Sequence, residues 1–488
     1  MTRTHQAHAV RRLVVTVIAL AVGGAGFLVS GLLSATGASL PAATPQGPCL
    51  GPQKKVERDL QGRVPPRDYA SGRAAKGYRC NTAQVSHRGR TGGFKVLRYT
   101  DSKGNTCAFY DSTRLFPSDT LFTATEGQGV VVLDMKNPAK PKKVANLQTP
   151  AMLSPHESLL LNQRRGLLVA ALGNAFTNVG LLEVYDVRTD CREPVLLSAT
   201  PDTLLGHESG FAPDGKTFYA VSTGGQTFVA IDLTDPTAPQ RIFEQFNVNY
   251  HGLRLSEDGR TLYAANIGND LSGADFPGEG LRILDVSEIQ DRKPDPRVRV
   301  ISNLVWPERS IPQVAQPFRR GGRDYLLQVD EFARRGLGDS ADASVGAARI
   351  IEVTDPARPK VISNLRLQVH QPAGRRASIS DPGASSPVGG YAGHYCSAPY
   401  RDNPRIVACS MLASGLRVFD ISNLRRPVEV AYFNEPFVPS TPLSTKAGAN
   451  AFSQPAWDVR RRSIWYTDGN TGFYVVRLTN GIGKLLAR

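Results

Sequence analysis

The chain has 488 residues, long enough for several average domains, and it carries a formal net charge of +15. A basic balance speaks to association with anionic partners rather than to fold. No basic run alternates with aromatic residues, so we exclude nucleic acid as a partner.

The N-terminus has the pattern of an export signal. Arg11 and Arg12 precede an apolar stretch that starts at Leu13, and the small residue Ala38 suits a signal-peptidase site. We predict a signal peptide over residues 1–38, with a twin-arginine signal as one variant. The alternative is an uncleaved anchor that holds the protein at the membrane, because an apolar run of about 20 residues can span a bilayer. Either way, the sequence predicts an exported protein that is extracellular or associated with the cell envelope.

Residues 39–92 are predicted to form an N-terminal extension and linker that contains disulfide-bonded cysteine. The chain has six cysteines, and an even number in an exported protein favours disulfides over metal-bound or catalytic thiols. Cys396 and Cys409 flank a short turn and are predicted to pair across neighbouring strands. The other four can pair in three ways, which the sequence does not rank: they are Cys49, Cys80, Cys107 and Cys191.

Residues 93–488 contain a repeated unit. A strand-like run ends in an acidic residue and a turn that is usually bounded by proline, as in Gly415-LRVFDISNLRRP, and seven such units can be set side by side. The acidic residue recurs every 46–68 residues, at Asp134, Asp186, Asp232, Asp285, Glu352 and Asp420. We interpret it as a side chain that caps the turn by accepting from backbone amides. This spacing is typical of propeller blades.

Strand-like runs before and after each acidic turn complete four antiparallel strands per unit. We therefore predict an all-β fold, a seven-bladed β-propeller of four-stranded antiparallel blades. The last unit, from Ser453, has a weak fourth strand, and Gly93-FKVLRYT is predicted to supply its outer strand and so close the ring. In the same comparison, the segment that starts at Asp111 aligns with the one that starts at Gln454.

The repeats resemble the LVIVD-repeat family of exported bacterial β-propellers, and Gly415-LRVFDISNLRRPVEVAYF is the most similar segment. The resemblance covers most of residues 94–480. It implies a propeller outside the cytoplasm and carries little information on activity, because propellers host many chemistries.

Four histidines occupy one position of the repeat, at the start of the innermost strand: His156, His207, His251 and His394. Innermost strands line the central channel, so these side chains should form a ring at the channel mouth. Gln313, Gln454 and Asp111 are predicted to fill the same position in the other units, and Glu157 and Glu208 lie beside the ring. Imidazole and carboxylate groups bind Cu, Zn or Fe, which makes a transition-metal ion one interpretation. The alternatives are a structural hydrogen-bond ring and a site for an organic ligand.

Long connections are predicted on the same face as this ring, at residues 268–279, 331–346, 371–393 and 434–452. Long loops on a rigid scaffold often carry binding function. One hypothesis is therefore a monomeric scaffold protein that binds an envelope polymer or a protein partner through this face. A second is a metal-dependent, copper-type oxidoreductase that uses the histidine ring. A lactonase-like hydrolase ranks below both, since it rests only on short patterns such as Tyr250-His-Gly.

Overall fold

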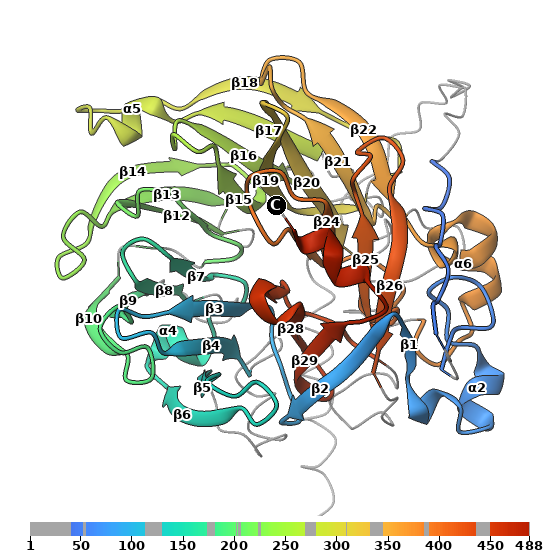
Figure 1. Ribbon diagram of the computed structural model, residues 1–488. Coiled ribbons are helices and arrows are strands. Elements are labelled where there is room, and N and C mark those ends of the chain that lie inside the picture. The colour runs from blue at the N-terminus through green and yellow to red at the C-terminus, as the bar shows by residue number, and fades with distance from the viewer. Residues whose placement is uncertain are drawn as a thin grey trace, which may run out of the picture.

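The computed structural model describes residues 41–51, 55–112, 129–172, 181–201, 203, 206–222, 226–268, 280–308, 310–331, 345–384, 390–435 and 449–487. Seven antiparallel sheets stand in a ring around a central channel (Figure 1), which confirms the predicted seven-bladed propeller. The predicted signal segment lies outside the described residues. Within the described residues, no helix is long and apolar enough to span a membrane.

Blades 1 to 4 each take four strands that are consecutive in the sequence. Blade 1 contains β3 (Val96–Thr100), β4 (Thr106–Asp111), β5 (Val130–Asp134) and β6 (Lys142–Leu147). Blade 2 contains β7 (Leu159–Asn162), β8 (Leu167–Ala171), β9 (Leu182–Asp186) and β10 (Val195–Thr200). Blade 3 contains β11 (Gly210–Phe211), β12 (Thr217–Ser222), β13 (Thr227–Asp232) and β14 (Gln240–Phe246). Blade 4 contains β15 (Tyr250–Leu255), β16 (Thr261–Asn266), β17 (Gly280–Asp285) and β18 (Arg299–Leu304).

Blades 5 to 7 complete the ring, and two of them recruit a strand from the N-terminal extension. Blade 5 contains β19 (Ile311–Arg320), β20 (Arg323–Glu331), β21 (Ala348–Glu352) and β22 (Lys360–Leu365). Blade 6 contains β23 (Tyr395–Ser397), β24 (Ile406–Ser410), β25 (Leu416–Asp420) and β26 (Val428–Asn434), with β1 (Tyr78–Cys80) as a fifth, outer strand. Blade 7 contains β27 (Ala456–Asp458), β28 (Ser463–Asp468) and β29 (Gly472–Leu478), and β2 (Thr82–Arg88) is its outer strand.

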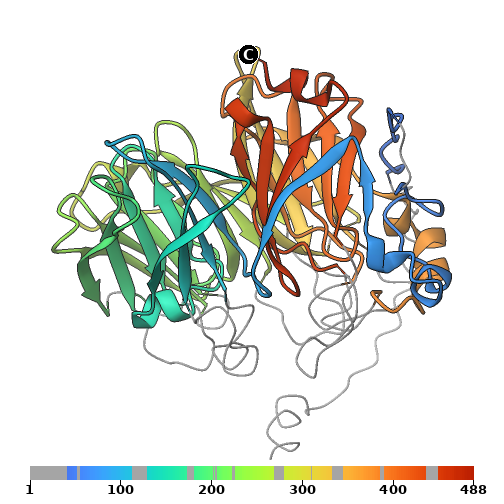
Figure 2. The same cartoon turned by 60° about the horizontal axis from the view of Figure 1, so that its bottom comes forward.

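The ring is closed by an N-terminal strand as predicted, but the strand is a different one. β2 pairs with β29 (Figure 2), whereas the predicted closing segment, Gly93-FKVLRYT, contains β3, the innermost strand of blade 1. The alignment of the Asp111 segment with the Gln454 segment is wrong for the same reason, because Asp111 ends a second strand and Gln454 precedes a first one. β2 and β3 are both half-buried, so alternation of apolar and polar residues does not distinguish the outer strand of blade 7 from the innermost strand of blade 1.

Short helices lie outside the sheets. They are α2 (Pro66–Ala70), η1 (Ala74–Lys76), α4 (Pro150–Leu153), α5 (Ser287–Gln290), η2 (Gln368–His370), α6 (Pro372–Ser378), η3 (Val459–Arg461) and η4 (Ile482–Leu486). The N-terminal extension with α2 packs beside α6 at the rim of blade 6 (Figures 1 and 2). Arg417, fully buried, anchors it there through ion pairs with Glu57 of the extension and Glu429 of β26.

The hydrophobic core is divided among the interfaces between blades. Each of the seven pairs of neighbouring blades contributes side chains to one buried apolar cluster. Trp465 of blade 7 packs with Val131 of blade 1 in the cluster that completes the circle. The burial of apolar surface between blades therefore stabilises the ring, and no single centre does so.

Two polar contacts recur at the turns between third and outer strands. In five blades the acidic residue of the turn accepts from the amide two residues later, at 2.7–2.9 Å, which confirms the predicted cap there; the acids are Asp134, Asp186, Asp232, Asp285 and Asp420. The sixth acid, Glu352, instead accepts from Arg323 at 2.7 Å. A serine in the outer strand donates to a carbonyl in the next blade's turn, as Ser302 does to Pro356 at 2.6 Å. Ser86 of β2 makes the same bond to Pro138, from blade 7 to blade 1.

The structure contains three disulfides. Cys396–Cys409 joins β23 to β24, as predicted. The pairs that the sequence left open are Cys49–Cys80, within the extension, and Cys107–Cys191, which joins blade 1 to blade 2. The described residues contain no free cysteine, which weakly indicates an oxidising compartment.

Candidate metal centre at the channel mouth

The four predicted ring histidines come together where the innermost strands begin. His156 and His207 precede β7 and β11, His251 lies in β15, and His394 precedes β23. The ring centroids of His156 and His207 are 4.6 Å apart, and those of His207 and His251 are 4.2 Å apart. Four blades thus place imidazoles on one side of the channel.

Glu157 lies at the centre of this group. Its Oε2 atom is 3.6 Å from His207 Nε2 and 3.6 Å from His251 Nδ1, and its Oε1 atom is 3.4 Å from His394 Nε2. Gln313 donates to Oε1 at 2.8 Å. The side chain of Glu157 is almost fully buried, so these groups are its surroundings in place of water.

A second carboxylate, Glu331, completes the cluster and was not predicted from the sequence. It accepts from His251 Nε2 at 2.7 Å and lies 3.3 Å from His394 Nε2. Glu331 ends β20, a second strand, whereas the repeated histidine position lies at the start of first strands. We refer to these six side chains as the histidine–glutamate cluster: His156, Glu157, His207, His251, Glu331 and His394.

Two trios within the cluster bring three donor atoms within 4.8 Å of one another. They are His156, Glu157 and His207, and Glu157, Glu331 and His394. Glu157 belongs to both trios. The first trio can offer an ion one carboxylate and two imidazoles, and the second two carboxylates and one imidazole. Either set suits Zn, Cu or Fe.

Burial opposes the charged form of each histidine, and neighbouring charges decide the outcome. Burial lowers the pKa of His156 and His207. At His394, hydrogen bonds to Glu157 and Glu331 outweigh burial and raise the pKa to about 9. At His251, the charges of Glu331 and Glu157 outweigh burial and also raise the pKa. The two carboxylates thus favour the charged forms of His394 and His251, whereas burial favours the neutral forms of His156 and His207.

Two phenylalanines lie beside the histidines in the remaining part of the ring. The amides of His207, His394, Phe452 and Gly93 make equivalent bonds to the second strands of blades 3, 6, 7 and 1. By this correspondence the histidine position is Phe452 in blade 7 and Gly93 in blade 1, and Phe94 follows Gly93. The ring centroids of Phe452 and Phe94 are 4.9 Å apart. Phe94 also packs against His156 at 4.4 Å. Imidazoles and carboxylates thus face a wall of two phenylalanines.

The places predicted for Asp111 and Gln454 need correction. Asp111 ends β4, a second strand, and its carbonyl accepts from Gly93, so it is not a channel-mouth residue of an innermost strand. Gln454 comes two residues after Phe452, which holds the histidine position of blade 7, and it contacts Lys95 at 3.3 Å and Arg254 at 3.2 Å. Gln313 is the only one of the three that reaches the cluster among the described residues.

Glu208 also lies deeper than predicted, in a layer of charged side chains below the cluster. Glu208 forms ion pairs with Lys95 and, at 2.5 Å, with Nη2 of Arg254, and it accepts a hydrogen bond from Tyr395 at 2.6 Å. We call Lys95, Glu208, Arg254, Tyr395 and Gln454 the channel plug. Burial lowers the pKa of Lys95 to about 8, although the charge of Glu208 opposes this shift.

The long connections were predicted on the face of the ring. The topology agrees, since they join blades or join second to third strands, where the innermost strands begin. Most residues of these connections lie outside the described part of the chain. The described portion of residues 371–393 includes α6.

No protein-family model matches this sequence, and no curated protein matches it. Several solved structures are similar in fold. Hydrazine synthase from Kuenenia stuttgartiensis is 14% identical, with a TM-score of 0.46 over 80% of this chain and 97% of that one. A periplasmic gluconolactonase from Pseudomonas aeruginosa is 12% identical, with a TM-score of 0.46 over 72% and 92%. A putative 6-phosphogluconolactonase from Bacteroides fragilis is 11% identical, with a TM-score of 0.43 over 72% and 90%. The likeness concerns the propeller fold, and no activity is carried over.

Proposed function

We propose that this chain is an exported metal-dependent enzyme whose histidine–glutamate cluster holds one transition-metal ion. The observation that carries the proposal is that two buried polar atoms, Glu157 Oε2 and His251 Nδ1, face each other at 3.6 Å and neither has a hydrogen-bond partner among the described residues. A buried polar atom without a partner is costly, so such a pair calls for an explanation. An ion between these atoms would satisfy both of them at once.

The distances support the same interpretation. Two ligands that bind one ion at about 2.0–2.2 Å lie roughly 3–3.5 Å apart in tetrahedral or octahedral geometry. Four distances between a carboxylate oxygen of Glu157 or Glu331 and a histidine nitrogen are 3.3–3.6 Å. The bond from His251 to Glu331, at 2.7 Å, is shorter. Most hydrogen bonds are shorter than these four distances. The cluster is thus spaced as ligands are, with small adjustments needed on binding.

The position of the cluster favours a catalytic ion over a structural one. His207 keeps 22% of its side chain exposed, whereas Glu157 keeps 2%. The ligand set is therefore buried on one side and reachable from the channel mouth on the other. An ion with an open position can activate water or bind a substrate oxygen as a Lewis acid, and Cu or Fe could also exchange electrons there. The chain's own carboxylates and imidazoles would hold the ion and accept or donate protons beside it.

Metal content of purified protein tests the proposal. We expect wild-type protein, loaded separately with Zn, Cu and Fe and then dialysed, to retain about one ion per chain by mass spectrometry. His251→Gln should lose it. His87→Gln is the matched control, because His87 lies on β2 and stacks on Tyr474 outside the cluster. Wild-type protein that retains none of the three metals, or a His251→Gln variant that retains as much as His87→Gln, would overturn the proposal.

A further inference from the structure

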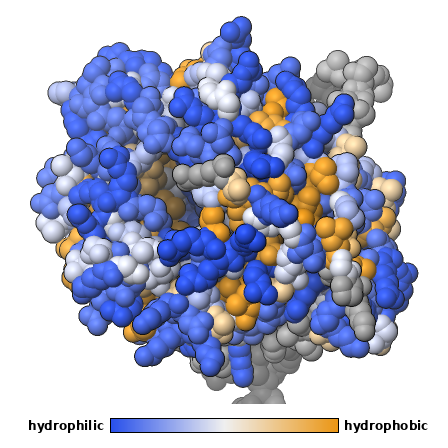
Figure 3. Space-filling model, in the orientation of Figure 1, coloured by the Kyte–Doolittle hydropathy of each residue, from blue (hydrophilic) through white to orange (hydrophobic). Residues whose placement is uncertain are grey.

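The opposite end of the channel contains a pocket of about 530 Å³. The pocket lies at the far ends of the innermost strands, and Figure 3 shows a hollow near the centre of this face. Its volume is within the range of small-molecule sites, roughly 300–1,000 Å³. Blades 2 to 7 contribute lining residues, both from their strands and from the short turns that follow the innermost strands.

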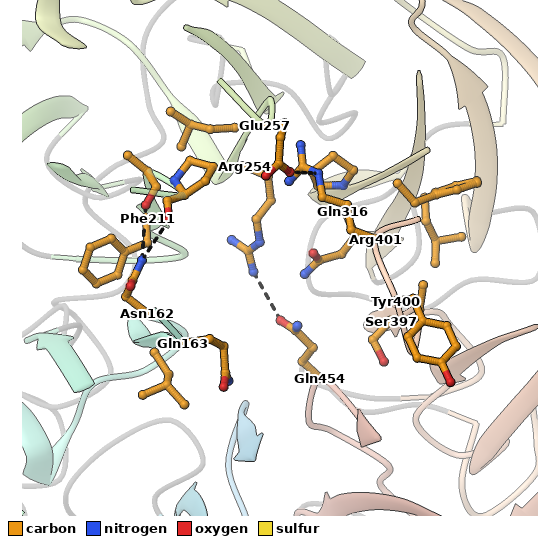
Figure 4. Close-up of a pocket in the computed structure, with 18 of the residues that line it drawn as sticks. Asn162, Gln163, Phe211, Arg254, Glu257, Gln316, Ser397, Tyr400, Arg401 and Gln454 are labelled. Atoms are coloured by element: carbon orange, nitrogen blue, oxygen red, sulfur yellow. Dashed lines mark hydrogen bonds and ion pairs between the residues drawn. The ribbon is translucent and has the colours of Figure 1, made fainter. Parts of the chain in front are cut away.

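The channel plug separates this pocket from the histidine–glutamate cluster. Arg254 extends toward the channel axis and donates to Gln454 (Figure 4). The Nη1 atom of Arg254 donates to the carbonyls of Ser209 at 3.0 Å and Leu253 at 2.6 Å. With the Gln316 amide oriented to suit its neighbours, its oxygen accepts from Arg254 Nε at 3.2 Å. Arg254 is therefore saturated and forms the floor of a distinct site.

The walls and the rim of the pocket differ in character. Apolar side chains line the walls, among them Phe211, Leu255, Phe318 and Leu327. Apart from Arg254, which pairs with Glu208, the charged lining residues are Arg164, Arg401 and Glu257. They leave one positive charge in excess. Arg401 Nε is 2.5 Å from Glu257 Oε2, and both side chains are partly or largely exposed at 34% and 73%.

We propose that this pocket binds a small organic monocarboxylate with an apolar body. The body would lie against the phenylalanine and leucine side chains, because burial of apolar surface drives such binding. The carboxylate would take the place of Glu257 on Arg401, whose planar guanidinium suits a carboxylate. The amides of Gln316 and Gln454 on the floor could accept or donate to a polar group on the body.

The ion pair between Arg401 and Glu257 gives a test, because substitution of its two members should change the affinity for a carboxylate in opposite directions. We would titrate full-length mature protein with 1-naphthaleneacetate by calorimetry and use the neutral 1-naphthaleneethanol as the matched probe. Arg401→Gln should weaken binding of the acid about 3- to 10-fold, whereas Glu257→Gln should tighten it about 2- to 5-fold because it frees Arg401. Neither change should affect the alcohol. Glu257 is exposed and Arg401 is partly exposed, so neither variant should fail to fold.

A filled pocket provides the second measurement. Ala398 lines the pocket and is partly buried, so Ala398→Phe should abolish binding of both probes while circular dichroism confirms the fold. Equal binding of acid and alcohol, equal effects of the two rim variants, or unchanged binding in Ala398→Phe would overturn the proposal. The outcome is independent of the metal proposal, because the His251→Gln variant should bind 1-naphthaleneacetate as the wild type does.

Discussion

The channel plug contains one carboxylate shared by two cations, and this imbalance predicts an asymmetry between two substitutions. Glu208 is fully buried with Lys95, and it pairs with both Lys95 and Arg254. Glu208→Gln leaves two cations facing each other without a counter-charge. Removal of one partner from a buried pair costs about 3–5 kcal/mol, so we expect a loss of about 4 kcal/mol in the free energy of unfolding.

Lys95→Met should cost much less, about 1 kcal/mol. The remaining pair, Glu208 with Arg254, is neutral, and Tyr395 still donates to Glu208. The methionine keeps the apolar stem but loses the contact of Nζ with the Tyr395 ring, 4.0 Å from its centroid, and the bond to Gln454. The burial that lowers the pKa of Lys95 is also relieved, which offsets part of the loss.

Chemical unfolding in urea at pH 7, followed by tryptophan fluorescence, measures both changes. Glu257→Gln is the control, since its ion pair with Arg401 lies at the surface and should be worth less than about 1 kcal/mol. The reasoning is refuted if Lys95→Met is as destabilising as Glu208→Gln. That result would mean that Lys95, rather than Arg254, provides the charge that Glu208 requires.

Three further predictions concern other parts of the molecule. Loss of Cys107–Cys191, with a sequence separation of 84, should destabilise the protein more than loss of Cys396–Cys409, with a separation of 13, by about 4.5 against 3 kcal/mol in thermal unfolding of the alanine pairs. Burial beside Asp468 raises the pKa of Glu435, so the folded chain keeps a proton that the unfolded chain loses above its ordinary pKa of 4.5. Stability should therefore fall as pH rises from that value, and Glu435→Gln should be more stabilising at pH 8 than at pH 4 in urea unfolding. Arg417→Met leaves Glu57 and Glu429 without their shared cation, so limited proteolysis should cut within residues 55–80 faster than in Arg425→Met, a control at an exposed arginine of the same blade.

The sequence predicted the blades well because each repeat carries its own local signals. The acidic turn, the proline that bounds it and the apolar strand before it recur within each unit, so the number of blades could be counted. The histidines at the start of four inner strands were placed correctly for the same reason. Their metal, the envelope partner and the export signal stay predictions.

The contacts that complete the site come from strands that no repeat position identifies. Lys95 was missed because its segment was assigned to the outer edge of blade 7, and the half-buried pattern of β3 suits either edge. Glu331 was missed because it ends a second strand. The serine bonds between blades also went unnoticed, although the motif Ile-Ser-Asn-Leu occurs at residues 301–304 and 362–365 with the bonding serine in the same place.

Glycines at the inner strands decide how closely the ligand residues can approach. Gly252 follows His251, and a Cβ atom there would lie 2.2 Å from the carbonyl oxygen of Gln313 and 2.7 Å from Cγ of Glu208. Any side chain at this position would therefore push β15 away from β19 and from the plug. Since Gln313 donates to Glu157 and His251 contacts Glu331, that separation would pull the cluster apart from both sides. His251 thus contributes a nitrogen atom to the cluster, and Gly252 beside it allows the close packing of backbones that brings the other cluster residues to this atom.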